Sequence, residues 1–174
     1  DEDDAQFFAM HGHGTYKPNS LAAISHQHQV AARNTAVGNL NYLILVPTLR
    51  CNLSCSYCQV SRANENQLGF DWSDEALSQV LTFIDALETK SVKIEFQGGE
   101  PTLRLDLIRA VIDRCERFEH AEFVICTNLS NVSDELISIL ANPNVFISTS
   151  LDGDRLVHEQ QRTHAGNRTD EFFI

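Results

Sequence analysis

Between residues 42 and 151, short apolar runs alternate with longer segments in which apolar residues recur at helical spacing. The apolar runs predict four strands, at Tyr42–Val46, Ser91–Phe96, Glu122–Thr127 and Val145–Leu151. The intervening segments predict three helices, the first capped by Ser73, the second spanning Leu103–Phe118 and the third capped by Ser133. Strands that alternate with helices in this way form a parallel sheet with right-handed crossovers, so the fold class is α/β. Because the first run is continuously apolar, its strand is expected to be buried on both faces.

Residues 1–39 differ from this pattern because they are rich in polar residues, glycine and histidine. They predict a polar N-terminal extension, followed by a core domain at residues 40–174. One modest helix is expected at Leu21–Arg33, with Ser20 as its N-cap. The His-x-His pairs that begin at His11 and His26 are interpreted as ordinary polar residues, because no acidic or cysteine partner lies at ligand spacing. Near the end of the sequence, Glu171–Ile174 are expected to open a fourth helix.

The 174 residues suffice for one domain with a sizeable core. Acidic residues number 24 against 13 basic ones, which gives a formal net charge of −11. Such a chain has no general attraction to phosphate backbones or anionic membrane surfaces, so neither nucleic acid nor a membrane is an expected partner. No apolar run approaches the roughly 20 residues that span a bilayer. The first four residues lack the basic and apolar regions of a signal peptide and are not expected to act as one.

Three of the five cysteines lie within eight residues, directly after the first expected strand. Cys51, Cys55 and Cys58 have the spacing Cys-x₃-Cys-x₂-Cys, which indicates metal binding in a reducing compartment and hence the cytoplasm. A structural zinc site normally has four protein ligands. A cubane iron–sulfur cluster held by three thiolates instead keeps one iron available for a substrate or cofactor. Zinc stays an alternative, with a fourth ligand from His13, His120 or Cys126.

The other unusual residues follow the carboxyl ends of the later strands, where parallel α/β folds bind their ligands. Gly98 and Gly99 lack side chains, which lets the main chain approach a ligand closely. Glu100 offers an acceptor for an ammonium or hydroxyl group. Away from these motifs, Cys115 and Cys126 are expected to be small buried thiols. The motifs at the three strand ends are Gln97-Gly98-Gly99-Glu100-Pro101, Thr127-Asn128 and Ser150-Leu151-Asp152-Gly153.

The cysteine spacing, the aromatic Tyr57 before the last cysteine and the Gly-Gly-Glu-Pro motif together resemble the radical S-adenosylmethionine (SAM) enzymes. The resemblance implies a [4Fe–4S] cluster held by Cys51, Cys55 and Cys58, with SAM chelated at the open iron. It also implies that one electron from the cluster cleaves SAM to a 5′-deoxyadenosyl radical, which abstracts a hydrogen atom from the substrate. The residues implied to bind or border SAM are Tyr57, Gln97, Gly98, Gly99, Glu100, Thr127, Asn128, Ser150, Asp152 and Arg162.

The resemblance further implies a (β/α) barrel of the TIM type with six strand–helix units, of which the four expected strands account for about four. The chain then corresponds to the N-terminal part of such a core, and the positions on the later strands are expected to be missing. The motifs alone do not establish that these 174 residues are active. Two alternatives stay open. One is a non-catalytic half barrel that is apo or binds zinc, and the other is a radical SAM enzyme that acts on a small molecule.

The fourth strand end narrows the resemblance to one group of these enzymes. Ser150–Gly153, followed by His158 and Arg162, resembles the peptide- and protein-modifying maturases, which include the anaerobic sulfatase maturases. In that group an arginine helps to order SAM, a role that suits Arg162 because a guanidinium is permanently charged and can bind in a bidentate manner. The alternative for His158 and Arg162 is a solvated helix or loop face.

A closer resemblance is to the radical SAM maturase of the His-Xaa-Ser peptide system. It implies a peptide or small-protein substrate and a reductant such as flavodoxin or ferredoxin. The stretches that carry it are Leu45–Arg50, Cys58–Arg62 and Lys93–Pro101.

Overall fold

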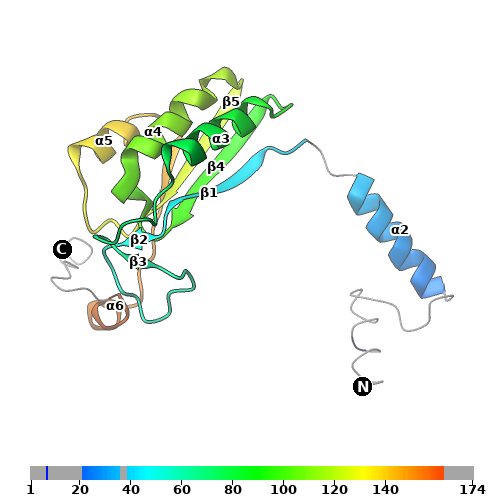
Figure 1. The fold of residues 1–174 in the computed structure, drawn as a ribbon. Helices are drawn as coiled ribbons and strands as arrows, with labels where there is room; N and C mark the ends of the chain where they lie inside the picture. The colour runs from blue at the N-terminus through cyan, green and yellow to red at the C-terminus, as the bar shows by residue number, and fades with distance from the viewer. Residues whose placement is uncertain (1–6, 8–20, 36–38, 163–174) are drawn as a thin grey trace. The chain divides into compact units, whose positions relative to one another are not determined.

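The computed structural model describes Phe7, residues 21–35 and residues 39–162 (Figure 1). Internal contacts divide the chain into two compact units, Asp1–Asn39 and Leu40–Ile174. In the first unit, helix α2 spans Leu21–Thr35, which confirms the helix predicted there and extends it by two residues. Three features expected from the sequence lie outside the described residues. They are the N-cap Ser20, the fourth helix at Glu171–Ile174, and the histidine pair His11 and His13.

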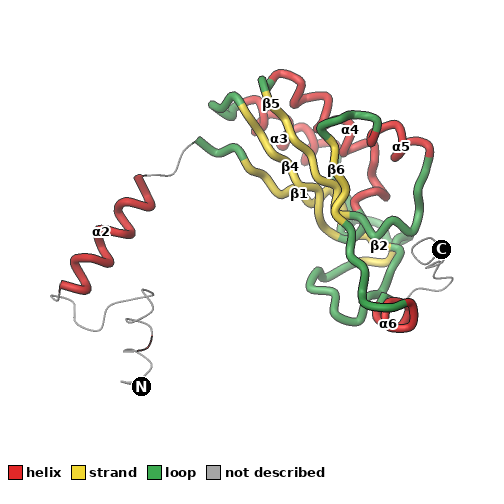
Figure 2. Tube along the Cα trace, turned by 180° about the vertical axis from the view of Figure 1, so that it is seen from behind, coloured by secondary structure: helices red, strands yellow, loops and turns green. Residues whose placement is uncertain are grey.

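The second unit is built on a four-stranded parallel sheet with the order β1-β4-β5-β6. Helices α3, α4 and α5 cover one face of this sheet, as the two views in Figures 1 and 2 show. The parallel α/β fold predicted from the sequence is therefore confirmed. The strands are β1 (Tyr42–Thr48), β4 (Ser91–Gly98), β5 (His120–Cys126) and β6 (Val145–Ser148), and the helices are α3 (Asp74–Asp85), α4 (Leu105–Arg114) and α5 (Asp134–Leu140).

The core lies between the sheet and the helices, as the alternation of residues along β4 shows. In β4, Val92, Ile94 and Phe96 are buried against the helices, whereas the residues between them point to the other face. Burial of each such large side chain contributes about 1.5–3 kcal/mol to folding. Ser73 and Ser133 cap α3 and α5 as predicted, since each hydroxyl accepts a hydrogen bond from a main-chain N–H at 3.2 Å.

The first strand differs from its prediction. Tyr42, Ile44 and Val46 are exposed, so the expectation that this strand is buried on both faces was wrong. The physical reason is that, within the described residues, helices cover only one face of the sheet. The uncovered face of β1 is apolar, and this is why its sequence shows no alternation.

Other elements also depart from the predicted bounds. The predicted helix Leu103–Phe118 consists of a 3₁₀ turn η1 (Pro101–Arg104), α4, and a second 3₁₀ turn η2 (Cys115–Arg117). A two-stranded parallel sheet of β2 (Arg50–Cys51) and β3 (Ala63–Asn64) and the helix α6 (Arg155–Gln161) were not predicted. Among the described residues, no helix has the length and apolar character needed to cross a membrane.

Candidate functional site

A cavity of about 440 Å³ lies at the carboxyl ends of the main strands, within the roughly 300–1,000 Å³ typical of cofactor and ligand pockets. Cys51, Cys55 and Cys58 all line it. Of the ten residues implied to bind or border SAM, Asp152 alone does not line the cavity. The remaining ones that do are Tyr57, Gln97, Gly98, Gly99, Glu100, Thr127, Asn128, Ser150 and Arg162. The topology therefore brings together motifs that lie up to about a hundred residues apart in the sequence.

The three cysteines differ in their surroundings. Cys51 lies at the end of β2 and is buried, which raises its thiol pKa to about 11. Burial also raises the pKa of Cys55, although the guanidinium of Arg162 opposes this effect. Cys58 is exposed, and its thiol donates to the main-chain oxygen of Val60 at 3.2 Å. Because the thiolate is the form that binds metal, a bound metal displaces the thiol protons of such a site.

The cysteine side chains are not arranged around a single point. In the part of the chain that the structure describes, no three histidine, cysteine or acidic side chains are grouped to hold one metal ion. The thiolates of a cubane cluster bind different irons and do not need to converge on one atom. Their soft sulfur donors suit an iron–sulfur cluster.

The glycine loop after β4 packs directly against the main chain that precedes Cys51. The N–H of Gly99 donates to the carbonyl of Thr48 at 3.0 Å, and the N–H of Glu100 donates to the carbonyl of Arg50 at 2.7 Å. A Cβ atom on Gly98 would lie 2.4 Å from the Thr48 carbonyl oxygen, and one on Gly99 only 2.2 Å from that of Arg50. The sequence predicted that the glycines allow close approach to a ligand. In the structure, the closest approach that they allow is between two loops of the protein.

Glu100 is 2% exposed, and its carboxylate is engaged within the protein. One oxygen accepts from the N–H and the hydroxyl of Thr102, at 3.1 and 2.6 Å, and the other accepts from the N–H of Asn128 at 2.8 Å. The side-chain amide of Asn128 in turn donates to Asn52, inside the cysteine loop, at 2.9 Å. Glu100 and Asn128 therefore tie together the ends of β2, β4 and β5.

Tyr57, Asp152 and Arg162 form a second contact network beside the cavity. The Tyr57 hydroxyl and the Arg162 Nε both donate to Asp152 Oδ2, the latter at 3.1 Å, and the guanidinium carbon lies 5.7 Å from the centroid of the tyrosine ring. Burial, together with the hydrogen bond to Asp152, raises the pKa of Tyr57 to about 12. Asp152 thus holds in place two residues that line the cavity, Tyr57 and Arg162.

His158 and Arg162 do not lie on a solvated face. His158 is 3% exposed, and its Nδ1 accepts from the N–H of Asp152 at 3.3 Å. The main-chain N–H of Ser56 donates to the carbonyl of Gln161 at 2.9 Å, which joins the end of α6 to the cysteine loop. The solvated-face alternative was wrong because α6, a helix not predicted from the sequence, packs these residues against the site.

The uncovered face of the sheet adds to the cavity lining Glu95, to which the sequence assigns no role, and Cys126, which it names only as an alternative zinc ligand. Glu95 accepts from the Tyr42 hydroxyl at 2.5 Å, from the Cys126 thiol at 3.1 Å and from the Gln97 amide. Glu95 and Cys126 both line the cavity. Cys115 is fully buried as predicted, whereas Cys126 is only half-buried. The alternation of polar and apolar residues along β4 was the signal that identifies Glu95 as a residue of the uncovered face.

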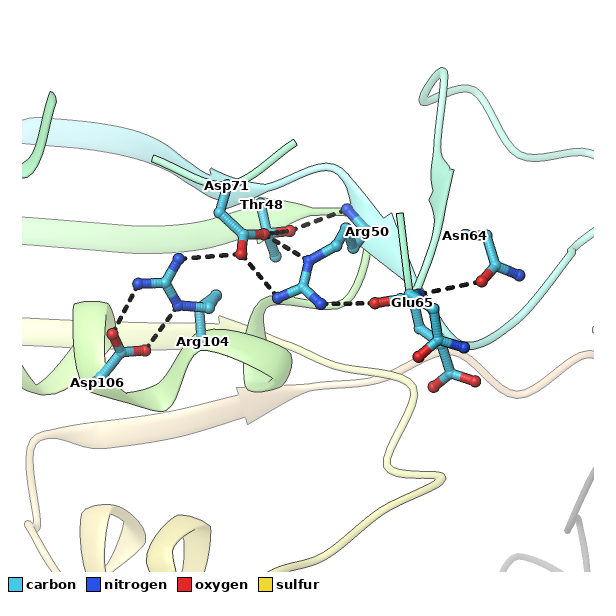
Figure 3. Close-up of polar contacts among 8 residues, drawn as sticks. Thr48, Arg50, Asn64, Glu65, Asp71, Arg104 and Asp106 are labelled. Atoms are coloured by element: carbon cyan, nitrogen blue, oxygen red, sulfur yellow. Dashed lines mark hydrogen bonds and ion pairs between the residues drawn. The ribbon is translucent and has the colours of Figure 1, made fainter. Parts of the chain in front are cut away.

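A polar network lies behind the cysteine loop (Figure 3). Asp71 accepts from Arg50 in a bidentate manner, Nε to Oδ1 and Nη2 to Oδ2, both at 2.7 Å. It also accepts from the Thr48 hydroxyl at 2.6 Å and pairs with Arg104 at 3.0 Å. Arg104 makes a second bidentate contact with Asp106. One carboxylate therefore contacts residues before the cysteines and after the glycines.

This network predicts a specific dependence of stability on pH. Burial raises the pKa of Asp71, but the hydrogen bonds from Arg50, Thr48 and Arg104 outweigh it and hold the pKa below its usual value. A lowered folded-state pKa contributes stability above the unfolded pKa of about 3.9, and that contribution is lost as the pH falls through the folded value. In thermal unfolding, the Tm difference between wild type and Asp71→Asn should be largest above about pH 5 and shrink steadily as the pH falls below the unfolded pKa of about 3.9. A Tm difference that is constant across this range would contradict the assignment of charge to Asp71.

The sequence model of the Radical SAM superfamily matches residues 45–171. An uncharacterized protein of Methanocaldococcus jannaschii is 28% identical over 120 residues, which cover 67% of this chain and 40% of that protein. A cysteine-type anaerobic sulfatase-maturating enzyme of Clostridium novyi is 25% identical over 138 residues, which cover 75% of this chain and 37% of the enzyme. The chain thus spans less than half the length of each relative.

The fold is also similar to that of a solved structure, native anSMEcpe with bound AdoMet and Cp18Cys peptide. The TM-score is 0.58 at 22% sequence identity, over 74% of this chain and 36% of that one. At this identity the likeness supports the partial barrel fold alone. The family match covers all the strand ends that line the cavity, with the cysteine loop and the glycine loop included. The chain therefore belongs to the radical SAM superfamily.

Proposed function

We propose that this protein binds a [4Fe–4S] cluster through Cys51, Cys55 and Cys58, binds SAM at the open iron, and modifies a side chain of a peptide or protein. The observation that carries this proposal is that the three cysteines and the Gly98–Gly99 loop line one cavity, and that main-chain hydrogen bonds join this loop to the residues directly before Cys51. Bound together, the reduced cluster and SAM supply a one-electron cleavage that generates a carbon radical able to abstract a hydrogen atom from the substrate.

The residues around the cavity are assigned roles in holding SAM. Gln97 and the main chain of Gly98–Glu100 would border the methionine end of SAM, and Tyr57 would lie beside its adenine. Asp152 fixes Tyr57 and Arg162 in place through the contacts described above. Arg162 provides a permanent positive charge for the SAM carboxylate or its surroundings. Thr127, Asn128 and Ser150 line the cavity at the ends of the next two strands and would border the cofactor there.

The carboxylate of Glu100 is assigned an indirect role. Both of its oxygens already accept hydrogen bonds from Thr102 and Asn128. In this position it fixes the glycine loop and the end of β5, so that their main-chain groups border the methionine end of SAM. A carboxylate held by several N–H and O–H donors is a rigid anchor for the segments that it joins.

A peptide or protein is the proposed substrate class. It is supported by the name of the Clostridium novyi relative, an enzyme that matures sulfatases, and by the peptide bound in the similar solved structure. The His-Xaa-Ser peptide maturases are the proposed subfamily. Flavodoxin or ferredoxin is the proposed reductant. The cytoplasm is the proposed location, because a cluster of free cysteines is typical of a reducing compartment.

Anaerobic reconstitution with iron and sulfide tests the proposal. The expected result is a brown protein that, with dithionite and SAM, forms 5′-deoxyadenosine and methionine detected by liquid chromatography and mass spectrometry. The same sample without dithionite should form neither. A colourless protein with one zinc per chain and no 5′-deoxyadenosine would support the non-catalytic half barrel instead.

A second assay separates the substrate classes. The reconstituted protein is incubated with SAM, reductant and a synthetic peptide containing His-Xaa-Ser repeats. The peptide is expected to change in mass only when SAM is present. If SAM is cleaved but neither this peptide nor a cysteine-containing control peptide changes in mass, the peptide assignment fails and the small-molecule alternative becomes the better one.

A further inference from the structure

The cysteine loop and the glycine loop meet along a seam of main-chain contacts, and the Arg50 carbonyl lies at its centre. This oxygen accepts the N–H of Glu100 at 2.7 Å. It also faces Gly99 so closely that no side chain fits between them. Because Arg50 directly precedes Cys51, the position of its main chain determines how far the first cysteine lies from the glycine loop.

The side chain of Arg50 is fixed by Asp71. The two hydrogen bonds of their bidentate contact are both 2.7 Å long, and Arg50 Nη1 also donates to the carbonyl of Glu65 at 2.6 Å. The side chains of Arg50 and Asp71 are only 20% and 25% exposed. Paired, partly buried charges of this geometry hold their partners more strictly than a single surface contact.

Asp71 is itself fixed to the end of β1. The N–H of Leu49 donates to the carbonyl of Phe70, and the N–H of Trp72 donates to the carbonyl of Pro47, both at 2.9 Å. The Thr48 hydroxyl donates to Asp71 at 2.6 Å and accepts from the Arg50 N–H at 2.9 Å. The carboxylate therefore has a defined position relative to the strand from which the cysteine loop departs.

The other side of the network reaches the glycine loop. Arg104, at the end of η1, pairs with Asp71 at 3.0 Å, and η1 begins directly after Glu100. In Figure 3, Asp71 lies between the two guanidinium groups and bridges them. One carboxylate thus holds the segments that carry the two halves of the proposed cofactor site.

We propose that Asp71 is a positioning residue for SAM, which keeps Cys51 and the Gly98–Glu100 loop at the separation that a bridging SAM molecule requires. Asp71 does not line the cavity and acts through Arg50 and Arg104. The inference rests on the proposed function, because it presupposes that SAM spans the cluster and the glycine loop.

Anaerobic equilibrium dialysis of labelled SAM against the reconstituted protein tests this role. In Asp71→Asn the Kd for SAM should rise about 10-fold or more, as for partners that orient ligand-binding groups, while the iron content per chain and the far-UV circular dichroism stay at wild-type values. Asp106→Asn is the matched control, because Asp106 shares the Arg104 guanidinium, makes no contact with Asp71 or Arg50 among the described residues, and is mostly exposed. Its Kd should change by no more than about 2-fold. Arg50→Lys keeps the charge but loses the bidentate contact, so it should reproduce the Asp71→Asn effect.

The outcomes distinguish this inference from the proposed function. If the wild-type protein binds no SAM, the proposed function fails. If the wild type binds SAM and both Asp71→Asn and Arg50→Lys bind it with the wild-type Kd, the positioning role is overturned. A loss of SAM binding that only follows a loss of iron would also overturn it, because Asp71 would then serve cluster retention. If Asp71→Asn does not fold, Arg50→Lys against Asp106→Asn carries the same test.

Discussion

Replacing Cys55 with alanine is expected to abolish cluster assembly and, with it, all SAM cleavage. Cys55 is one of the four cysteines that line the cavity. Cys51 and Cys58 are already assigned as ligands, and the thiol of the fourth, Cys126, lies at the end of β5 and donates to Glu95. With two ligands left, the cluster is not held, so iron and sulfide per chain should fall to background. The visible colour and the formation of 5′-deoxyadenosine should disappear together.

Cys115→Ala is the matched control for this experiment. Cys115 is a fully buried cysteine in η2, within the core and outside the cavity. Its replacement is expected to lower the free energy of unfolding by about 1 kcal/mol and to leave the iron content unchanged. Equal SAM cleavage by wild type and Cys55→Ala would remove the basis for assigning a cluster to this loop.

Replacing Gly99 with alanine is expected to have the next largest effect. The new methyl group would lie 2.2 Å from the Arg50 carbonyl oxygen and 2.6 Å from that of Leu49. Both obstacles are main-chain atoms, which cannot rotate away as a flexible side chain can, so the two loops must move apart. A displacement of about 1 Å at a reacting centre can cost about 100-fold in rate, and we expect SAM cleavage to fall by about that factor. Overpacking of this kind should also destabilise the fold by about 1–3 kcal/mol.

Gly69→Ala separates the effect of the close contact between Gly99 and the Arg50 main chain from a general effect of adding a methyl group. Gly69 has a positive φ of 86°, but a Cβ there would meet nothing within 4 Å. Its replacement should cost only the backbone strain of about 1–2 kcal/mol and leave SAM cleavage at the wild-type rate. Thermal unfolding measures the loss of stability, and the 5′-deoxyadenosine assay measures the rate of SAM cleavage. If Gly99→Ala has the same activity and Tm as Gly69→Ala, the close contact between the loops has no functional importance.

Features with a local or topological signature could be predicted from the sequence. Ser73 and Ser133 cap their helices as predicted, because a capping hydroxyl bonds to an N–H three residues away. The cysteine and glycine loops meet as expected, because the carboxyl ends of parallel strands lie at one edge of a sheet. The anaerobic sulfatase-maturating relative agrees with the resemblance that these motifs carry.

The remaining features depend on contacts between distant residues, for which the sequence carries no periodic signal. Arg50 and Asp71 lie 21 residues apart, and no pattern in either segment indicates the bidentate contact between them. His158 is buried and accepts from the N–H of Asp152, yet it lies on α6, a seven-residue helix with few apolar residues. The exposed face of β1 has an apolar sequence, so its exposure follows from what covers the sheet and not from the residues themselves.

The most direct test of the central claim is electron paramagnetic resonance of the dithionite-reduced, reconstituted protein with and without SAM. The claim is that Cys51, Cys55 and Cys58 hold a [4Fe–4S] cluster whose open iron binds SAM in the cavity beside Gly98 and Gly99. We predict a signal from one reduced cluster per chain that changes its g-values when SAM is added, because SAM then becomes a ligand of the open iron. A cluster signal that SAM leaves unchanged, or a protein that binds zinc and no iron, would contradict the claim.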